Sequence, residues 1–295
     1  MGSLDYRALA VLDAVASHGS FDKAALALGI TQSAVSQRIK ALEDASGRLL
    51  IIRGQPAVPT GLGQRLIVHH RNVKLMEASL DIDLGNSVSL PEIAIAVDAD
   101  SLATWFADAL PALLAPPRCQ LDVRLADSQT ALQLVRDGAV FGCIASDDAA
   151  ADTATAASVT ALGSLHYVCV ATPQFAGHWF GDGLRREALQ LAPAVISQHG
   201  LLARFLREQL AFNETFPHHT LPEQTAHRSC ITDGLAYGLL PQRLAAQALA
   251  SDRLVDLAPG HTLELPLSWH AWTLDTPYTR LLSEQIIRTA QQYLR

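Results

Sequence analysis

The chain has 295 residues, a formal net charge of −7 and 49% hydrophobic residues. This length predicts two or three domains, and the apolar fraction is large enough for substantial cores. The first predicted helix is interrupted by Asp5, Arg7 and Asp13, which excludes a secretion signal there. The longest charge-free stretch, residues 153–181, is broken by Gly, Ser, His and Pro and does not resemble a membrane span. We therefore expect a cytoplasmic protein without membrane segments.

The charge is unevenly distributed along the chain. Residues 1–75 hold nine Lys or Arg against five Asp or Glu, a net charge of +4, which leaves −11 for residues 76–295. A basic N-terminal part on an acidic body favours local contact with the phosphate backbone of DNA.

Residues 21–40, FDKAALALGITQSAVSQRIK, predict two short helices separated by a turn at Gly29–Thr31. Gly29 can adopt the left-handed conformation that ends a helix. Thr31 can accept a backbone N–H as the N-cap of the next helix. Two helices joined by a turn of about three residues form a helix-turn-helix. Taken alone, the stretch is equally compatible with two ordinary solvated helices.

The second of these helices has an apolar stripe of Val35, Ile39 and Leu42 and an opposite face without carboxylates before Glu43. Such a helix fits the major groove, where amides and hydroxyls pair with base edges. Two short apolar segments around the turn at residues 54–56 predict a wing formed by a strand at residues 49–53 and a return at residues 58–60. The predicted DNA-binding residues are Thr31, Gln32, Ser33, Ser36, Gln37, Arg38, Lys40 and, on the wing, Arg53.

A long helix is predicted from Gly61 to Leu84, with Thr60 as its cap. It has more apolar positions than one inner stripe requires, which indicates a dimerisation helix. Residues 85–91 are predicted to form a linker.

From Glu92 onward, strands alternate with helices, which predicts α/β layers. A single helix is expected over Ser101–Leu114, and further helices over residues 130–137, 201–210, 243–249 and 278–294, near Leu184 and near residues 231–237. Strands are expected at residues 93–97, 121–125, 140–145, 165–171, 194–196, 254–257 and 265–272, with residues 149–157 as a loop. The fold class is therefore an N-terminal winged helix-turn-helix with a long linker helix, followed by two Rossmann-like α/β lobes of the periplasmic-binding-protein type. The expected domains are residues 1–60, 61–90 and 91–295, the last divided into lobe I (91–164 and 268–295) and lobe II (165–267).

Two lobes joined by two chain crossings form a hinged cleft in which a small ligand can bind. The N-terminus of the helix near Ser101 offers free N–H groups to an anion, and acidic side chains at strand ends could accept an ammonium group. For Asp100 and Ser101, a plain capping role is an equal alternative. The predicted effector-binding residues are Asp98, Asp100, Ser101, Thr104, Asp127, Ser128, Ser197, Gln198 and His199.

The N-terminal 75 residues resemble the LysR-type transcriptional regulators. The resemblance rests on Phe21 with Ala24–Ala25, the run TQSAVS at residues 31–36, Leu42–Glu43, Arg53, and Pro59–Thr60 with Gly63. ITQSAVSQRIKALE, the run DSLATW at residues 100–105 and SWH at residues 268–270 are similar to the ArgP/LysG group of that family. The group implies lysine or arginine as effector and control of basic amino-acid export. Residues 197–202, SQHGLL, depart from the acidic residues that the group tends to carry there.

The resemblance implies a non-enzymatic homodimer or homotetramer that binds an interrupted palindrome near a promoter and can act with RNA polymerase. The four scattered cysteines and the histidine spacing predict no metal site, and the absence of G-x-S-x-G, P-loop and G-x-G-x-x-G motifs predicts neither a cofactor nor an enzyme. Two alternatives remain open: a sensor of the same family with an effector other than an amino acid, and a cytoplasmic two-lobed binding protein or enzyme without a role on DNA.

Overall fold

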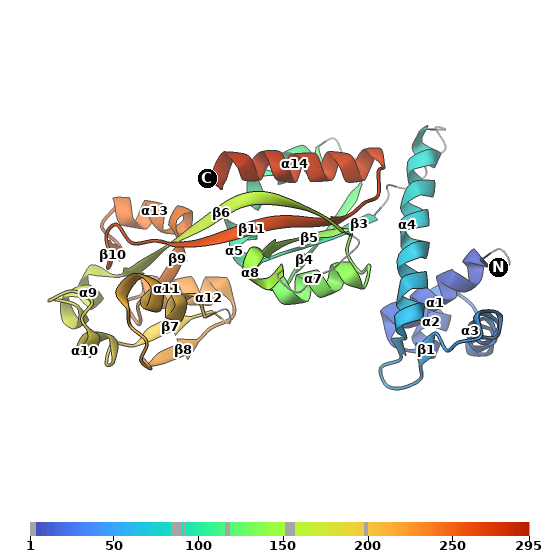
Figure 1. Cartoon of the computed structure of the whole chain (residues 1–295), viewed down its shortest axis with the longest axis horizontal. Coiled ribbons are helices and arrows are strands. Elements are labelled where there is room, and N and C mark those ends of the chain that lie inside the picture. Colours follow the sequence, from blue (N-terminus) through green and yellow to red (C-terminus); the bar gives the residue numbers. More distant parts are fainter. Residues whose placement is uncertain are drawn as a thin grey trace.

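The computed structural model describes residues 4–83, 90, 92–115, 119–150, 157–197 and 200–294. Its elements lie in three groups along the long axis of the molecule (Figure 1). The N-terminal group, which we call the head, comprises α1 (Tyr6–His18), α2 (Phe21–Leu28), α3 (Gln32–Ser46), β1 (Ile51–Ile52) and β2 (Val58–Pro59). The long helix α4 (Gly61–Asp83) runs from the head beside the C-terminal domain.

The helix ends of the head follow the capping residues of the sequence. Ser20 and Thr31 accept backbone N–H groups at the starts of α2 and α3. Gly29 ends α2 with a φ of 64° and Gly47 ends α3 with a φ of 66°, a conformation that costs glycine little. The predicted helix-turn-helix is therefore present. The strand expected over residues 49–53 is shorter than predicted, because only Ile51 and Ile52 pair with β2.

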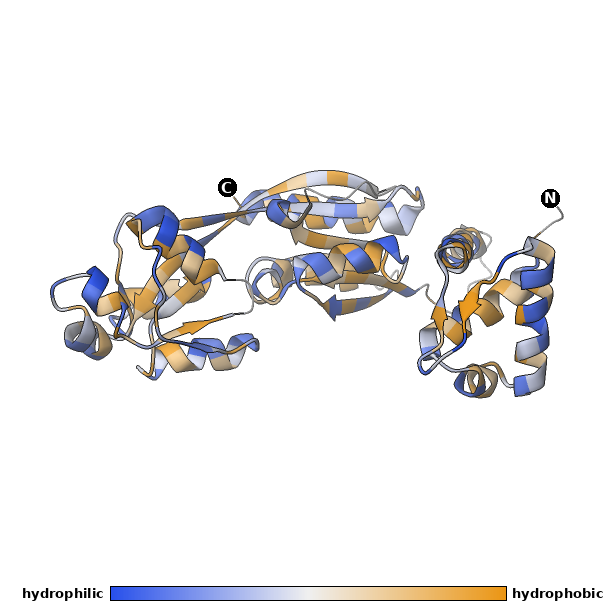
Figure 2. Cartoon of the chain, turned by 60° about the horizontal axis from the view of Figure 1, so that its bottom comes forward, coloured by the Kyte–Doolittle hydropathy of each residue, from blue (hydrophilic) through white to orange (hydrophobic). Residues whose placement is uncertain are grey.

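The core of the head lies between α1, α2, α3 and the start of α4. Leu9, Leu12, Val35 and Ile39 are fully buried there, together with Ile67 of α4. Burying each such side chain stabilises the fold by about 1.5–3 kcal/mol, so this cluster contributes to holding the three helices together. Figure 2 shows the same inward segregation of hydrophobic residues in the head and in the C-terminal domain.

The C-terminal domain is organised around a seven-stranded sheet with the order β10-β6-β11-β5-β3-β4, to which β9 is added beside β6. The strands β3 (Glu92–Val97), β4 (Gln120–Leu125) and β5 (Gly142–Ser146) are parallel at one end. The long antiparallel strands β6 (Ala157–Ala171) and β11 (Leu263–Trp272) run from this end to the other, where β9 (Gly238–Pro241) and β10 (Val255–Asp256) join β6. In Figure 1, β6 and β11 extend from the part of the sheet that holds β3, β4 and β5 to the part that holds β9 and β10.

Helices cover this sheet, and a separate parallel pair of strands lies at its far end. That pair consists of β7 (Ala194–Ile196) and β8 (His218–Thr220). The helices are α5 (Ala99–Ala103), the 3-10 helix η1 (Phe106–Asp108), α6 (Leu110–Leu114), α7 (Ser128–Arg136), α8 (Asp147–Ala150), α9 (Pro173–Trp179), α10 (Arg186–Leu189), α11 (Leu201–Leu210), α12 (Gln224–Thr232), α13 (Gln242–Ala250) and α14 (Pro277–Tyr293).

Several predicted elements differ from the observed ones. The single helix expected over Ser101–Leu114 is divided into α5, η1 and α6, because the backbone leaves the helical region at Thr104, where ψ is −91°. The helix expected near residues 231–237 lies earlier, over Gln224–Thr232, and Leu184 lies between α9 and α10. β6 begins before the predicted position 165, α8 (Asp147–Ala150) extends into the predicted loop 149–157, and β8 was not predicted. The linker at residues 85–91 lies almost wholly outside the described residues.

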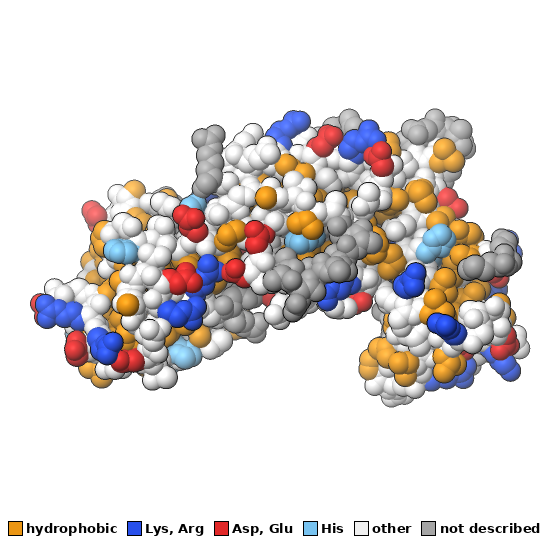
Figure 3. All heavy atoms as spheres, viewed as in Figure 1, with side chains coloured by type: hydrophobic (Ala, Val, Ile, Leu, Met, Phe, Trp, Pro, Cys, Tyr) orange, Lys and Arg blue, Asp and Glu red, His pale blue; other side chains and the backbone are white. Residues whose placement is uncertain are grey.

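The helix α4 presents apolar side chains to solvent along its second half. Met76 is 46% exposed and Leu80 is 59% exposed. Figure 3 shows hydrophobic side chains on the surface around α4 and the head. Among the described residues, no helix is long and apolar enough to cross a membrane.

Candidate functional site

The predicted DNA-binding residues lie on the outer surface of the head. Gln32, Ser33, Gln37, Arg38 and Lys40 are exposed on α3, whereas Ser36 is half-buried. The Thr31 hydroxyl is engaged at the helix start, where it accepts the Ala34 N–H at 3.2 Å and contacts the Ser33 hydroxyl at 3.0 Å.

The structure brings the wing and the start of α3 together around one hollow of about 250 Å³. Arg53, Gln32 and Ser36 line this hollow. The Arg53 guanidinium lies over the Phe21 ring, 5.5 Å from its centroid, which holds the cation beside α3. Gln32 Nε2 donates to Ser36 Oγ at 3.2 Å. Gln37, Arg38 and Lys40 lie outside the hollow, farther along the same helix.

A second and larger cavity, which we call the cleft, has a volume of about 540 Å³. One side of the cleft is formed by the ends of β3, α5, α7 and α8, and the other by β7, α11, α12 and β9. This volume is in the range typical of small-molecule sites. The charged side chains that line the cleft among the described residues are Asp98, Asp100, Asp127, Asp148 and Arg204, together with the titratable Tyr167 and His227.

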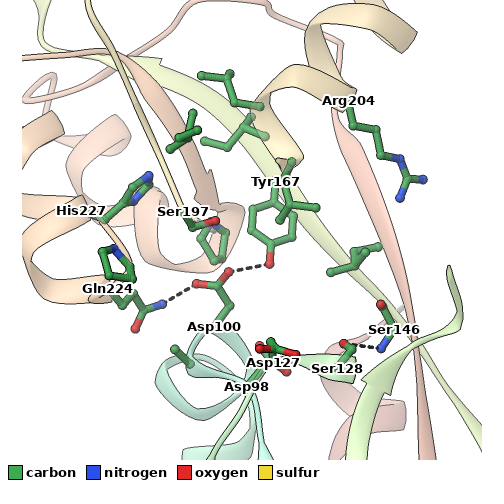
Figure 4. A pocket seen from close by; sticks show the side chains of 18 of the residues that line it. Asp98, Asp100, Asp127, Ser128, Ser146, Tyr167, Ser197, Arg204, Gln224 and His227 are labelled. Atoms are coloured by element: carbon green, nitrogen blue, oxygen red, sulfur yellow. Dashed lines mark hydrogen bonds between the residues drawn. The ribbon is translucent and has the colours of Figure 1, made fainter. Parts of the chain in front are cut away.

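Asp100 is the carboxylate at the centre of a hydrogen-bond network in the cleft (Figure 4). Tyr167 donates its hydroxyl to Asp100 Oδ2 at 2.7 Å, and Gln224 Nε2 donates to Oδ1 at 2.6 Å. Burial and the neighbouring carboxylates raise the pKa of Tyr167 well above its usual value, so its hydroxyl keeps its proton and remains a donor. The two donors hold the Asp100 carboxylate in place from elements 67 and 124 residues away.

Asp98 and Asp127 each cap a helix at the edge of the cleft. Asp98 Oδ1 accepts the Ser101 N–H at 2.8 Å, and Asp127 Oδ1 accepts the Thr130 N–H at 2.9 Å. Burial raises the pKa of Asp98, an effect that its hydrogen bonds to Ser101 oppose.

The helix predicted to begin near Ser101 begins earlier, directly after its cap Asp98. α5 begins at Ala99, so Ser101 lies inside its first turn, and its buried side chain does not line the cleft. Thr104 is also buried outside the cleft, where its hydroxyl donates to the Asp100 carbonyl at 2.6 Å.

The remaining predicted positions differ in their placement. Ser128 lines the cleft, and its Oγ accepts the Ser146 N–H at 2.9 Å. Ser197 lines the opposite side, after β7. Gln198 and His199 lie outside the described residues.

The residues that enter the cleft from distant elements were not predicted from the sequence; they are Tyr167, Arg204, Gln224 and His227. Arg204 of α11 forms an ion pair with Asp148 of α8 at 2.5 Å, and both side chains line the cleft. His227 is buried on α12, and this burial lowers its pKa, so the ring is neutral at pH 7. The alternation of strands and helices does not show which of these side chains point inward, because that depends on contacts between distant segments.

Comparison with known proteins gives two family matches that together cover most of the chain. Residues 6–64 match the model of the bacterial regulatory helix-turn-helix protein, lysR family, and residues 89–291 match the LysR substrate binding domain. The chain is 36% identical to the HTH-type transcriptional regulator ArgP of Pseudomonas fluorescens over 299 residues, with 98% of each chain covered. It is 38% identical to ArgP of Pseudomonas aeruginosa over 294 residues, with 97% of this chain and 96% of the relative covered.

Solved structures show the same likeness over the full length. ArgP from Mycobacterium tuberculosis superposes with a TM-score of 0.88 at 32% identity and covers 99% of each chain. LysG from Corynebacterium glutamicum with bound effector Arg superposes with a TM-score of 0.79 at 28% identity, covering 99% of this chain and all of that one.

Proposed function

Because the chain belongs to the LysR family of bacterial transcriptional regulators, which bind DNA and are not enzymes, we propose that its effector is arginine or lysine. The observation that carries this proposal is the charge of the cleft. Four carboxylates line it against one guanidinium among the described residues. A cavity with this excess of one sign concentrates ligands of the opposite sign.

Asp100 and Asp127 are the carboxylates we assign to the cationic side chain of the effector. Arg204 already pairs with Asp148, and burial raises the pKa of Asp98. Asp100 is held by two uncharged donors, Tyr167 and Gln224, and not by a cationic side chain. A guanidinium or ammonium group beside it would form a charge-assisted hydrogen bond, which is shorter and stronger than a neutral one.

The α-carboxylate of the effector needs donors at the other end of the cleft. Arg204 of α11 supplies a guanidinium there. The LysG structure with bound effector Arg supports arginine as the class of ligand, because its chain superposes on this one over the full length.

On DNA, we assign base contacts to the exposed face of α3 and a phosphate contact to Arg53. A single helix-turn-helix binds weakly, and the exposed apolar side of α4 supports association of two or four copies that place paired heads on an interrupted palindrome. The proposed layout keeps a head at residues 1–60, a linker helix at 61–90 and an effector domain at 91–295. The protein would act in the cytoplasm at promoters bound by RNA polymerase, and its targets would include a basic amino-acid exporter.

A thermal-shift screen of the purified protein with the twenty amino acids tests the effector. A ligand at about 100 times its Kd stabilises the folded state by about 2.7 kcal/mol. Arginine or lysine is expected to raise the Tm selectively and to change affinity for a duplex selected from random sequences. A shift with only a neutral or acidic amino acid, or with none of the twenty, would contradict the proposed effector. Failure to select any duplex, with binding that does not depend on salt, would contradict the DNA-binding assignment of α3.

A further inference from the structure

Helix α7 has one end at the cleft and the other end against α4. Its cap Asp127 and its first residues Ser128 and Gln129 line the cleft. At the opposite end, Asp137 and Gly138 contact α4 through their backbone carbonyls. Nine helical residues span about 13 Å, so one short element reaches both the proposed effector site and the helix that leads to the head.

Two side chains of α4, Gln64 and Arg71, form the hydrogen bonds to this end of α7, and we call them the clamp. Gln64 Nε2 donates to the Asp137 carbonyl, and Arg71 Nη1 donates to the Gly138 carbonyl at 2.8 Å. Carbonyl groups at a helix C-terminus lack intrahelical partners and lie at the negative end of the helix dipole. A guanidinium and an amide donor therefore satisfy groups that α7 cannot satisfy by itself.

The turn after α7 is packed too closely on α4 to move independently of it. Gly138 has a φ of +58°, and a Cβ at this position would lie 2.3 Å from Val68 Cγ2 of α4. Only glycine allows this approach at this backbone conformation.

Arg71 also joins this contact to the head. Its Nη2 donates to Asp13 Oδ1 at 2.6 Å and to Ser17 Oγ at 3.1 Å, and its Nε donates to the same Asp13 oxygen at 3.0 Å. Asp13 and Ser17 belong to α1, which packs on α2 and α3 in the core of the head. One guanidinium thus connects the end of α7 with the helices that carry the DNA-binding surface.

Between its two ends, α7 packs on the sheet. Ala131, Leu132 and Val135 are buried against β3 and β5. The indole N–H of Trp272 in β11 donates to the Val135 carbonyl at 2.9 Å. These contacts hold α7 as one rigid element, so that a displacement of its end at the cleft also displaces its end at α4.

We propose that α7 and the clamp couple occupancy of the cleft to the position of the DNA-binding head. A ligand that contacts Asp127 or Ser128 biases the position of α7, and Gln64 and Arg71 pass this bias to α4 and α1. The chemical identity of the ligand rests on the proposed function, whereas the coupling through α7 does not. Coupling is reciprocal, so DNA bound at the head must also affect α7.

The first experiment uses this reciprocity and needs no effector. Hydrogen exchange of the full-length protein is measured with and without a duplex selected from random sequences. We expect DNA to change exchange over residues 127–139 in the wild type but not in the double variant Gln64→Ala/Arg71→Ala. The matched control Asn72→Ala/Lys74→Ala removes an amide and a cation from the same helix, at positions with no hydrogen bond to α7 among the described residues, and should respond like the wild type.

Retention of the DNA-induced change in the clamp variant, or its absence in the wild type, would overturn the proposal. Duplex affinity of each variant is measured in parallel. If the double clamp variant no longer binds DNA, its substitutions have disrupted the head itself. The single variant Gln64→Ala, whose side chain makes its hydrogen bond to α7 and not to the head, then replaces the double variant.

The second experiment measures duplex affinity with and without arginine. In a coupled regulator, the duplex affinities with and without arginine differ by roughly 5- to 150-fold. In the clamp variant we expect these two affinities to lie within about 2-fold of each other. The affinity of the variant for arginine itself should be unchanged. An undiminished ratio in the clamp variant contradicts the proposal. If arginine does not bind the wild type, the effector assignment fails, and the exchange experiment alone decides the coupling.

Discussion

Replacing Asp100 by Asn removes one negative charge from the cleft with little change in shape. The side chain keeps its size, and an amide can still hydrogen-bond to both Tyr167 and Gln224, the two donors that now hold the carboxylate at 2.7 and 2.6 Å. Two unit charges about 5 Å apart attract each other by about 3 kcal/mol at an effective dielectric constant of about 20. Hydrogen bonds to charged groups contribute about 1.5–3 kcal/mol. We therefore expect a loss of about 2 kcal/mol, which is about 30-fold in the Kd for arginine.

Isothermal titration of the wild type and Asp100→Asn with arginine measures this loss directly. Glu284→Gln, which neutralises an exposed carboxylate on α14 outside the lining of the cleft, is the charge-matched control and should bind like the wild type. The Tm of each variant without ligand shows that the domain is folded. Equal arginine affinity in Asp100→Asn and the wild type would refute the assignment of Asp100 to the cationic group.

Three further predictions concern the head and the pH dependence of stability. In DNA-binding assays, Gln37→Ala should relax base preference, whereas Arg53→Ala should weaken binding to all sequences and reduce the salt slope by about 1; an unchanged preference in both would contradict the assignment of the α3 face. Gly63→Ala should destabilise the head by about 1–3 kcal/mol in urea unfolding, because the new Cβ would lie 2.1 Å from the Leu50 carbonyl oxygen; a free energy of unfolding equal to that of the wild type would disprove this clash. Burial lowers the pKa of His227 below its value in the unfolded chain, so the unfolded state binds more protons and stability falls as the pH is lowered through about 6.5. His227→Gln should reduce the drop in Tm between pH 7 and pH 5, and an equal drop would show that His227 does not contribute.

The helix-turn-helix was predictable because its signals are local. Ser20, Thr31 and Gly29 each act on a backbone group within three or four residues, and the predicted helix over residues 201–210 likewise matches α11. The prediction of one helix from Ser101 to Leu114 was wrong because the feature that divides this helix is not local. Its apolar positions continue through Thr104, but the backbone turns there so that Trp105 and Phe106 enter the core, and this is set by tertiary packing rather than by helix propensity.

The cleft was only half predictable. Asp98, Asp127 and Ser128 follow strands of a parallel sheet, where side chains of ligand sites are expected, and the structure places all three at the cleft. Gln224 is 124 residues from Asp100, and the helix that carries it was misplaced by several residues. Tyr167 lies in the middle of a strand whose pairing with β11 and β9 decides which face it presents. Neither side chain carries a local signal for its partner.

The central claim, that the cleft recognises a cationic amino acid, is tested most directly by comparing arginine with citrulline, its neutral counterpart of nearly the same shape. Both ligands are titrated into the wild-type protein under the same conditions. We predict that arginine binds about 30-fold more tightly, because citrulline cannot form a charge-assisted hydrogen bond with Asp100. Equal affinity for the two ligands, or tighter binding of citrulline, would contradict it.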